Sequence, residues 1–171
     1  MKTFAYDLIV VGAGSGGYAA ARVARDRGAA VALVDQGPLG GLCILRGCMP
    51  SKTLLRTAEI AQEIRESAEL GVGTGPPVVD FAHVMARKRR IIQGFADYRI
   101  DQINAFPLYE GRARFLDARR LQVGDGVVLT ASKFIIATGS VTAPPALEGL
   151  AQVGYIAVSY THLRAHETGR N

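Results

Sequence analysis

The pattern of apolar and polar positions in the first 35 residues predicts a βαβ unit. Tyr6–Val11 (YDLIVV) is a short, β-branched apolar run that is typical of a buried strand. The alanine-rich stretch 18–27 predicts a helix, and Gly28 suits its C-terminal cap. A second apolar run, Ala30–Asp35 (AVALVD), predicts another strand, which ends in an acidic residue.

In the middle of the chain, the apolar residues recur at the spacing of a helix. Apolar residues recur every three or four positions after residue 53, at Leu54, Leu55, Ala58, Ala61, Ile64 and Ala68. Gly71–Pro77 (GVGTGPP) predicts a loop, and Asp80 can cap a second, long helix. We expect one apolar face on that helix, formed by Val84, Ile91, Phe95, Tyr98 and Ile103.

After residue 107 the pattern changes to short strands separated by turn residues. Leu108–Phe115, Arg120–Val123 and Val127–Thr130 predict a small antiparallel meander, with the turn 124–126 between the last two strands. Lys133–Ala137 (KFIIA) predicts a final apolar strand. The predicted fold is therefore α/β, a Rossmann-like sheet with crossing helices and a small antiparallel meander.

Composition narrows the class of protein. The 171 residues are 49% hydrophobic, which suits one domain or a fragment of something larger. Twenty basic and fifteen acidic residues give a net charge of +5, a mild excess that suits an anionic cofactor and does not indicate a nucleic-acid partner. The basic run 87–90 falls in the predicted long helix, where a solvated face is expected. We predict no signal peptide, because Asp7 interrupts the apolar start, and no membrane span, because no apolar stretch is long enough.

Three glycines stand between the first predicted strand and the first predicted helix. Gly12, Gly14 and Gly17 form a GxGxxG pattern, which makes a tight turn, lets a pyrophosphate approach the backbone and lets helix meet strand. The helix N-terminus supplies amide donors for phosphates. Asp35 is placed to accept a hydrogen bond from a ribose hydroxyl. These residues predict a dinucleotide site without separating FAD from NAD.

Both cysteines lie in one glycine-containing segment. A regular helix would separate the α-carbons of Cys43 and Cys48 by about 7.5 Å, whereas a disulfide needs roughly 4.4 to 6.8 Å. If the two are bonded, the backbone must be irregular, and Gly47 permits this. Closing so short a loop stabilises the chain by only ~2 kcal/mol, so an exchangeable bond is the favoured interpretation. Two buried, reduced cysteines remain an alternative, and no metal site is predicted. A redox pair of this kind suits a reducing, cytoplasmic location.

The segment 40–52, GGLCILRGCMPSK, resembles the redox-active motif of the pyridine nucleotide-disulfide oxidoreductases, whose usual form is GGTCxNxGCxPSK. The chain departs from that form at Leu42 and Leu45. The resemblance implies that Cys43 exchanges with substrate and that Cys48 sits against a flavin. A helix N-terminus or a nearby cation would stabilise the Cys48 thiolate.

The resemblance also implies a cofactor and the residues around it. FAD is expected at the glycine loop, with NAD(P)H as co-substrate of the full-length parent. The residues expected to bind FAD are Gly12, Gly14, Gly17, Asp35, Gly40, Gly41, Lys52, Ala113, Thr138 and Gly139. Thr138 and Gly139 belong to an ATG sequence that makes a second flavin contact in this family, and Ala113 to a Gly-x-Ala sequence near the adenine.

The resemblance covers roughly residues 4 to 157, so residues 1–157 are interpreted as the N-terminal part of an FAD-binding, redox-disulfide domain. Residues 158–171 are expected to be a non-native tail. The implied activity of the parent is FAD-dependent NAD(P)H:disulfide oxidoreduction of the dihydrolipoamide dehydrogenase type, on a small-molecule disulfide and in a homodimer. Electrons would pass from NAD(P)H to FAD, to the cysteine disulfide and to substrate. The alternatives are a mercuric reductase-like enzyme acting on a mercuric ion and a noncatalytic flavin- or nucleotide-binding fragment.

Overall fold

A computed structural model describes residues 4–141, 143–150 and 152–153. Its six strands are β1 (Tyr6–Val11), β2 (Val31–Asp35), β3 (Leu108–Glu110), β4 (Ala113–Phe115), β5 (Arg120–Val123) and β6 (Val127–Ile136). They form one sheet in the order β3-β2-β1-β6-β5-β4. The helices are α1 (Ser15–Asp26), α2 (Gly41–Leu45), α3 (Cys48–Glu66) and α4 (Phe81–Asn104), with a 3₁₀ turn η1 (Ser67–Leu70) after α3.

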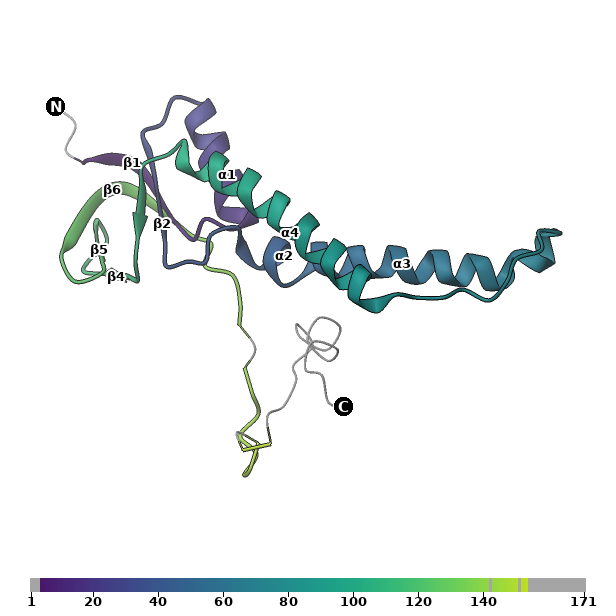
Figure 1. Ribbon diagram of the computed structural model, residues 1–171. Coiled ribbons are helices and arrows are strands. Elements are labelled where there is room, and N and C mark those ends of the chain that lie inside the picture. Colours follow the sequence, from purple (N-terminus) through teal and green to yellow (C-terminus); the bar gives the residue numbers. More distant parts are fainter. Residues whose placement is uncertain (1–3, 142, 151, 154–171) are drawn as a thin grey trace. The chain divides into compact units, whose positions relative to one another are not determined.

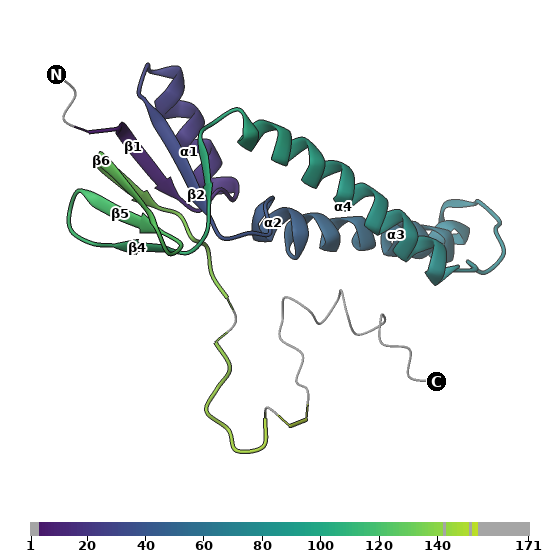
Figure 2. The same ribbon diagram turned by 60° about the vertical axis from the view of Figure 1, so that its left-hand side comes forward.

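Strand β6 joins a parallel and an antiparallel half of the sheet. Its second half pairs parallel with β1, in the register Leu8 to Lys133 through Val11 to Ile136, while its first half pairs antiparallel with β5. Strands β2 and β3 continue the parallel half on the other side of β1. Figures 1 and 2 show α1 along the β1–β2 part of the sheet and the β4–β5 hairpin curling away beyond β6.

The alternating side chains of β1 and β2 fill two hydrophobic clusters. Leu8, Val10 and Leu33 point to the face that packs against α1, where Ala21, Ile103 and Phe106 complete the cluster. The opposite set forms a second cluster with the antiparallel strands, made of Ile9, Val11, Ala32, Val34, Leu121, Val123, Leu129 and Ala131. Both faces of β1 and β2 are therefore covered, as expected for parallel strands in an α/β sheet.

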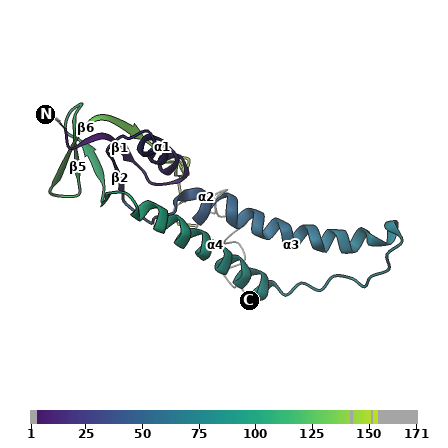
Figure 3. The same cartoon turned by 90° about the horizontal axis from the view of Figure 1, so that it is seen from above.

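Among the described residues the chain divides into two compact parts, residues 4–43 with 95–141, and residues 44–94 with 143–150 and 152–153. The sheet, α1 and the glycine loop lie in the first part. The second contains α3, η1 and the first part of α4, joined by the loop after η1, as Figure 3 shows. Asp80 caps α4, because its carboxylate accepts a hydrogen bond of 2.9 Å from the His83 amide.

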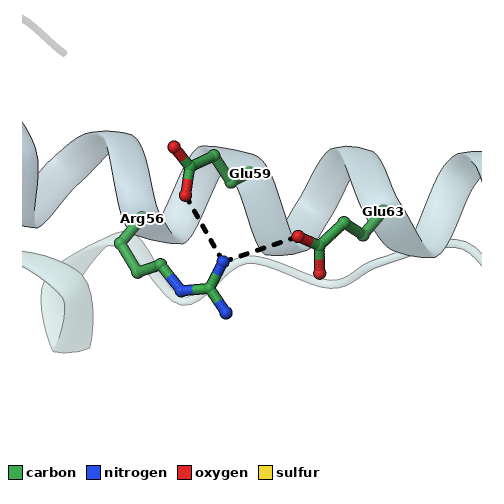
Figure 4. Close-up of polar contacts among 3 residues, drawn as sticks. All are labelled: Arg56, Glu59 and Glu63. Carbon is green, nitrogen blue, oxygen red and sulfur yellow. Dashed lines mark hydrogen bonds and ion pairs between the residues drawn. The ribbon is translucent and has the colours of Figure 1, made fainter.

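The outer surface of α3 carries a small ion-pair network. The Arg56 guanidinium lies 3.3 Å from a Glu59 carboxylate oxygen and 3.5 Å from one of Glu63, as Figure 4 shows. All three side chains are more than half exposed, so these pairs add little stability. Across the described residues, no helix is long and apolar enough to cross a bilayer.

The strands predicted after residue 107 were wrong in two respects. The predicted strand Leu108–Phe115 is two strands, because the chain turns at Gly111 and β3 joins the parallel edge beside β2. The predicted strands Val127–Thr130 and Lys133–Ala137 are one continuous strand, β6, ending at Ile136. The antiparallel meander is confirmed as β4, β5 and the first half of β6.

The predicted apolar face of α4 was also partly wrong. Phe95 and Tyr98 are 44% and 63% exposed, while Met85, Lys88 and Ala96 are buried. Ile103 is fully buried as expected.

Candidate functional site: a dinucleotide loop and a cysteine pair

The glycine loop connects β1 to the N-terminus of α1, as the sequence predicts. A β-carbon on Gly17 would overlap the Gly12 carbonyl oxygen and lie 2.9 Å from its carbon, so only glycine lets α1 start this close to β1. Gly12 has φ +102° and is backed by the Ala137–Thr138 backbone at the end of β6. The loop is thus held between α1 and the carboxyl end of β6.

Gly14 is left open for a ligand. Among the described residues, and apart from its chain neighbours, a β-carbon built on Gly14 would come within 4 Å of the Gly41 α-carbon alone, at 3.6 Å. Gly14 occupies the N-cap position of α1, where it has no side chain to accept a hydrogen bond from the amides of the first turn. Amide donors at a helix N-terminus with unobstructed backbone are the features that hold a pyrophosphate.

Gly41 connects the cysteine segment to this loop. It has φ +77°, and a β-carbon there would lie 2.7 Å from the Gly14 α-carbon. Since Gly41 is the first residue of α2, which also contains Cys43, the backbone that carries Cys43 starts against the dinucleotide loop. Gly40, with φ +116°, turns the chain just before it.

Asp35 lies at the edge of the glycine loop and forms hydrogen bonds that stabilise it. One carboxylate oxygen accepts a hydrogen bond of 2.6 Å from the Ala13 amide, and the other accepts one of 2.7 Å from the Gly37 amide. Its backbone carbonyl accepts the Gly111 amide at 2.8 Å. Each carboxylate oxygen has a further lone pair, so the interaction with a ribose hydroxyl predicted from sequence stays possible and stays a prediction.

The other expected flavin contacts lie at the same end of the sheet. Thr138 and Gly139 follow β6 directly and are exposed, behind Gly12. Ala113 begins β4, two residues after Gly111, whose amide bonds to Asp35. The carboxyl ends of β1, β2 and β6 thus gather the candidate residues of the first part of the chain, as is typical of ligand sites in open α/β sheets.

The two cysteines lie on separate helices. Cys43 is half-buried in α2, and Cys48 is exposed as the first residue of α3. The structure holds both as thiols rather than as a disulfide. The expected irregularity is present: Gly47 has φ −126° and ψ −108°, so the backbone leaves the helical region between α2 and α3.

Lys52 lies one turn after Cys48 on α3, and its side chain is exposed. Residues four apart share one face of a helix. Cys48 and Lys52 therefore share one face of α3 at its N-terminal end. Among the described residues no group of three or more histidine, cysteine or acidic side chains could hold a metal ion.

Sequence reasoning missed two features of the site. One is the contact between Gly41 and Gly14. Two consecutive glycines before a cysteine indicate a close backbone approach, but they do not identify the residue that is approached. The other is Ser51, whose hydroxyl donates a hydrogen bond of 2.9 Å to the Gly47 carbonyl. A serine four residues after a glycine at a predicted helix start is the signal that was available.

These features define a class of protein: a dinucleotide-binding α/β domain whose cofactor loop contacts the start of a segment that carries two cysteines at redox-type spacing. FAD fits the residues present, because Gly14 leaves room for the pyrophosphate and the N-terminus of α1 offers amide donors.

Comparisons with known proteins give the family. The model of the pyridine nucleotide-disulphide oxidoreductases matches residues 6–169, and the chain belongs to that family. It is 35% identical over 155 residues to the mercuric reductase of Lysinibacillus sphaericus, covering 88% of this chain. It is 34% identical over 140 residues to the dihydrolipoyl dehydrogenase of Chlamydia muridarum, covering 80% of this chain.

The fold is confirmed by a solved structure. The HOCl-induced flavoprotein disulfide reductase RclA from Escherichia coli matches with a TM-score of 0.69 and 25% identity over 85% of this chain. The family depends on FAD and takes electrons from NAD(P)H. The chain spans only 28% and 30% of the two curated relatives and 31% of the solved chain. The expected tail, residues 158–171, lies outside the described residues, and its origin stays a prediction.

Proposed function

We propose that this chain supplies the FAD-binding and cysteine-exchange part of an NAD(P)H-dependent disulfide oxidoreductase. The observation that carries the proposal is the backbone contact between Gly41 and Gly14, because it starts the helix of Cys43 against the loop that fits a dinucleotide. FAD, when bound, supplies two-electron transfer between a nicotinamide and the cysteine pair. Gly12, Gly14 and Gly17 would hold its pyrophosphate, and Asp35 its ribose.

The chemistry of the chain's own residues is thiol–disulfide exchange. In the dithiol form, the Cys43 thiolate attacks one sulfur of a small-molecule disulfide, and the sulfur–sulfur bond of the substrate breaks to release one thiol. The Cys48 thiolate then attacks the Cys43 sulfur, which releases the second thiol and leaves a Cys43–Cys48 disulfide. Two electrons and two protons restore the dithiol. Lys52 and the N-terminus of α3 stabilise the Cys48 thiolate through both steps.

A lipoamide-type disulfide, as in a dihydrolipoamide dehydrogenase-like protein, is our first candidate substrate, because Pro50-Ser51-Lys52 resembles the lipoamide and mercuric branches of the family rather than the glutathione branch. Reduction of a mercuric ion is the second candidate, favoured by the similarity to mercuric reductases. In that reaction the two thiolates would bind the ion as sulfur ligands, which suit a soft metal.

Flavin spectroscopy on the purified chain tests the proposal. The chain is saturated with FAD, freed of unbound flavin and reduced by two electron equivalents. We expect a bound-flavin spectrum and, on reduction, a long-wavelength absorption band that is absent from Cys48→Ser. Cys43→Ser has no disulfide to take up the two electrons, so its band should be present before reduction. A chain that binds flavin without this band, or with a band that survives Cys48→Ser, would favour the noncatalytic flavin-binding fragment instead.

Thiol counting separates the two substrates. After reduction and removal of reductant, oxidised lipoamide should convert two thiols per chain to a disulfide. Mercuric chloride should block the same two thiols without oxidising them, so that a thiol chelator restores them. If lipoamide leaves the thiol count unchanged while a mercuric ion is bound stoichiometrically, the first candidate is wrong and the second stands.

A further inference from the structure

We propose that Ser51 is a positioning residue for the Cys48 thiol, an inference that rests on the proposed function and deepens it. The Ser51 hydroxyl donates a hydrogen bond of 2.9 Å to the Gly47 carbonyl oxygen. The Ser51 amide reaches the same oxygen at 3.3 Å. The hydroxyl bond is the shorter of the two, so the side chain holds this carbonyl more closely than the backbone does.

The carbonyl of Gly47 and the amide of Cys48 belong to one peptide group. Because that group is planar, a hydrogen bond that fixes the carbonyl also fixes the plane in which the Cys48 nitrogen lies. The next bond along the chain is the one from nitrogen to the Cys48 α-carbon. Ser51 therefore sets the position of the cysteine without touching its sulfur.

The N-terminus of α3 has no side-chain cap. Gly47 occupies the N-cap position and has no side chain to accept a hydrogen bond from the first turn. The bond from Ser51 to the Gly47 carbonyl therefore supplies a side-chain contact at a helix start whose N-cap residue has none of its own.

This arrangement is unusual for a serine in a helix. A hydroxyl that bonds the carbonyl four residues earlier is neutral or slightly unfavourable for helix stability in general. At the first turn of α3 it has a specific effect, since it keeps the helix beginning at Cys48 and so keeps the thiol at the positive end of the dipole. Loss of the hydroxyl would leave the Gly47 carbonyl with the longer amide bond alone, and so would hold the peptide group before Cys48 less firmly at the positive end of the helix.

The test is the pH profile of Cys48 alkylation by iodoacetamide, in a Cys43→Ser background where Cys48 is the single cysteine. Alkylation forms a sulfur–carbon bond to the thiolate and releases iodide. Ser51→Val and Ser51→Thr have the same shape and differ only in the hydroxyl. We expect Ser51→Val to move the midpoint of the profile upward by about half a pH unit and to slow alkylation at pH 7 about threefold, the size of one charge–dipole interaction at a helix N-terminus.

Two controls sharpen the comparison. Ser51→Thr keeps the donor and should reproduce the parent profile. Ser67→Ala removes a similar hydroxyl bond, from Ser67 to the Ile64 carbonyl just beyond the C-terminal end of α3, and should also leave the profile unchanged. Ser51→Ala supplies a second hydroxyl-free variant with high helix propensity and should behave as Ser51→Val does. Equal midpoints for the valine, alanine and threonine variants would overturn the proposal.

Equilibration of the two-cysteine chain with glutathione buffers keeps this inference separate from the proposed function. If the parent forms a Cys43–Cys48 disulfide and Ser51→Val shifts its midpoint while Ser51→Thr does not, both stand. If the parent forms no such disulfide, the proposed function fails, while the alkylation profiles still decide whether Ser51 positions Cys48.

Discussion

Replacing Gly17 with alanine puts one methyl group where the dinucleotide loop meets α1. The new β-carbon would overlap the Gly12 carbonyl oxygen and lie 3.2 Å from a γ-carbon of Val10. The obstructing atoms at Gly12 are backbone, so no side-chain rotation can relieve the overlap. Either α1 moves away from β1 or the loop changes its path.

The expected loss of stability in Gly17→Ala follows from the cost of overpacking. An added carbon in a closely packed interior costs about 1–3 kcal/mol, and the backbone overlap places Gly17→Ala at about 3 kcal/mol. For a chain of this length each kcal/mol lowers the melting temperature by about 2–4 °C, so we expect a fall of about 6–12 °C. FAD affinity should fall as well, because the loop would no longer present its amides in one arrangement.

Gly16→Ala is the matched control, since it makes the same substitution in the same turn of α1. Nothing lies within 4 Å of a β-carbon at Gly16. Alanine is the better helix former by about 1 kcal/mol, so this variant should be as stable as the parent or more stable. Both variants are measured by urea and thermal unfolding followed by circular dichroism, and by FAD retention. Equal stabilities of the two alanine variants would refute the steric reasoning.

Three further predictions concern other contacts. Asp35→Ala removes the acceptor of two backbone amides and should lower the free energy of unfolding by about 2–4 kcal/mol in urea titrations, with Asp35→Asn intermediate. The Tyr6 hydroxyl hydrogen-bonds that of Tyr109 at 2.7 Å, and this bond, with burial, raises the pKa of Tyr6 to about 12 from 10.0. The Tyr6 contribution to stability should therefore be complete below pH 10 and be lost as pH rises toward 12, a dependence that Tyr6→Phe reduces in unfolding titrations between pH 9 and 12. Arg56→Ala should change stability by no more than about 0.5 kcal/mol in urea titrations, because its ion pairs are exposed.

Each of these has a result that contradicts it. An Asp35→Ala variant as stable as the parent would mean that the loop is held by other contacts. A Tyr6→Phe variant with the parent's full loss of stability at high pH would assign that loss to another group. A loss of 2 kcal/mol or more in Arg56→Ala would show that its network is worth far more than exposed pairs normally are.

Local signals explain what the sequence predicted well. Tyr6–Val11 is a strand with the predicted bounds, because five of its six residues are apolar and the run ends at a glycine turn. Gly28 follows the C-cap of α1 with φ +84°, as expected of a glycine just past a helix end. Asp80 caps α4 through its own carboxylate. Each of these depends only on neighbours within a few residues.

The features that the sequence did not predict depend on distant partners. Leu108–Glu110 pairs with β2, and Gly111 turns the chain where its amide bonds to the Asp35 carbonyl. The alternation of apolar and polar residues predicts that such a segment is extended, but it does not identify the strand with which the segment pairs. The same holds for the contact between Gly41 and Gly14, which requires the three-dimensional path of the chain.

The shared strand β6 has a consequence for folding during synthesis. The Ser132 hydroxyl bonds the Asp7 carbonyl across 125 positions of sequence, so the open side of β1 stays unpaired until nearly the whole described chain has been made. Until then β1 presents a bare strand edge, a surface prone to intermolecular pairing, and the turn at Gly12 lacks its backing from Ala137. The nascent chain must pass through a stage in which its cofactor loop is exposed and incomplete. Such late closure of a long-range pairing is expected to make folding slow and to make this stage sensitive to the supply of FAD.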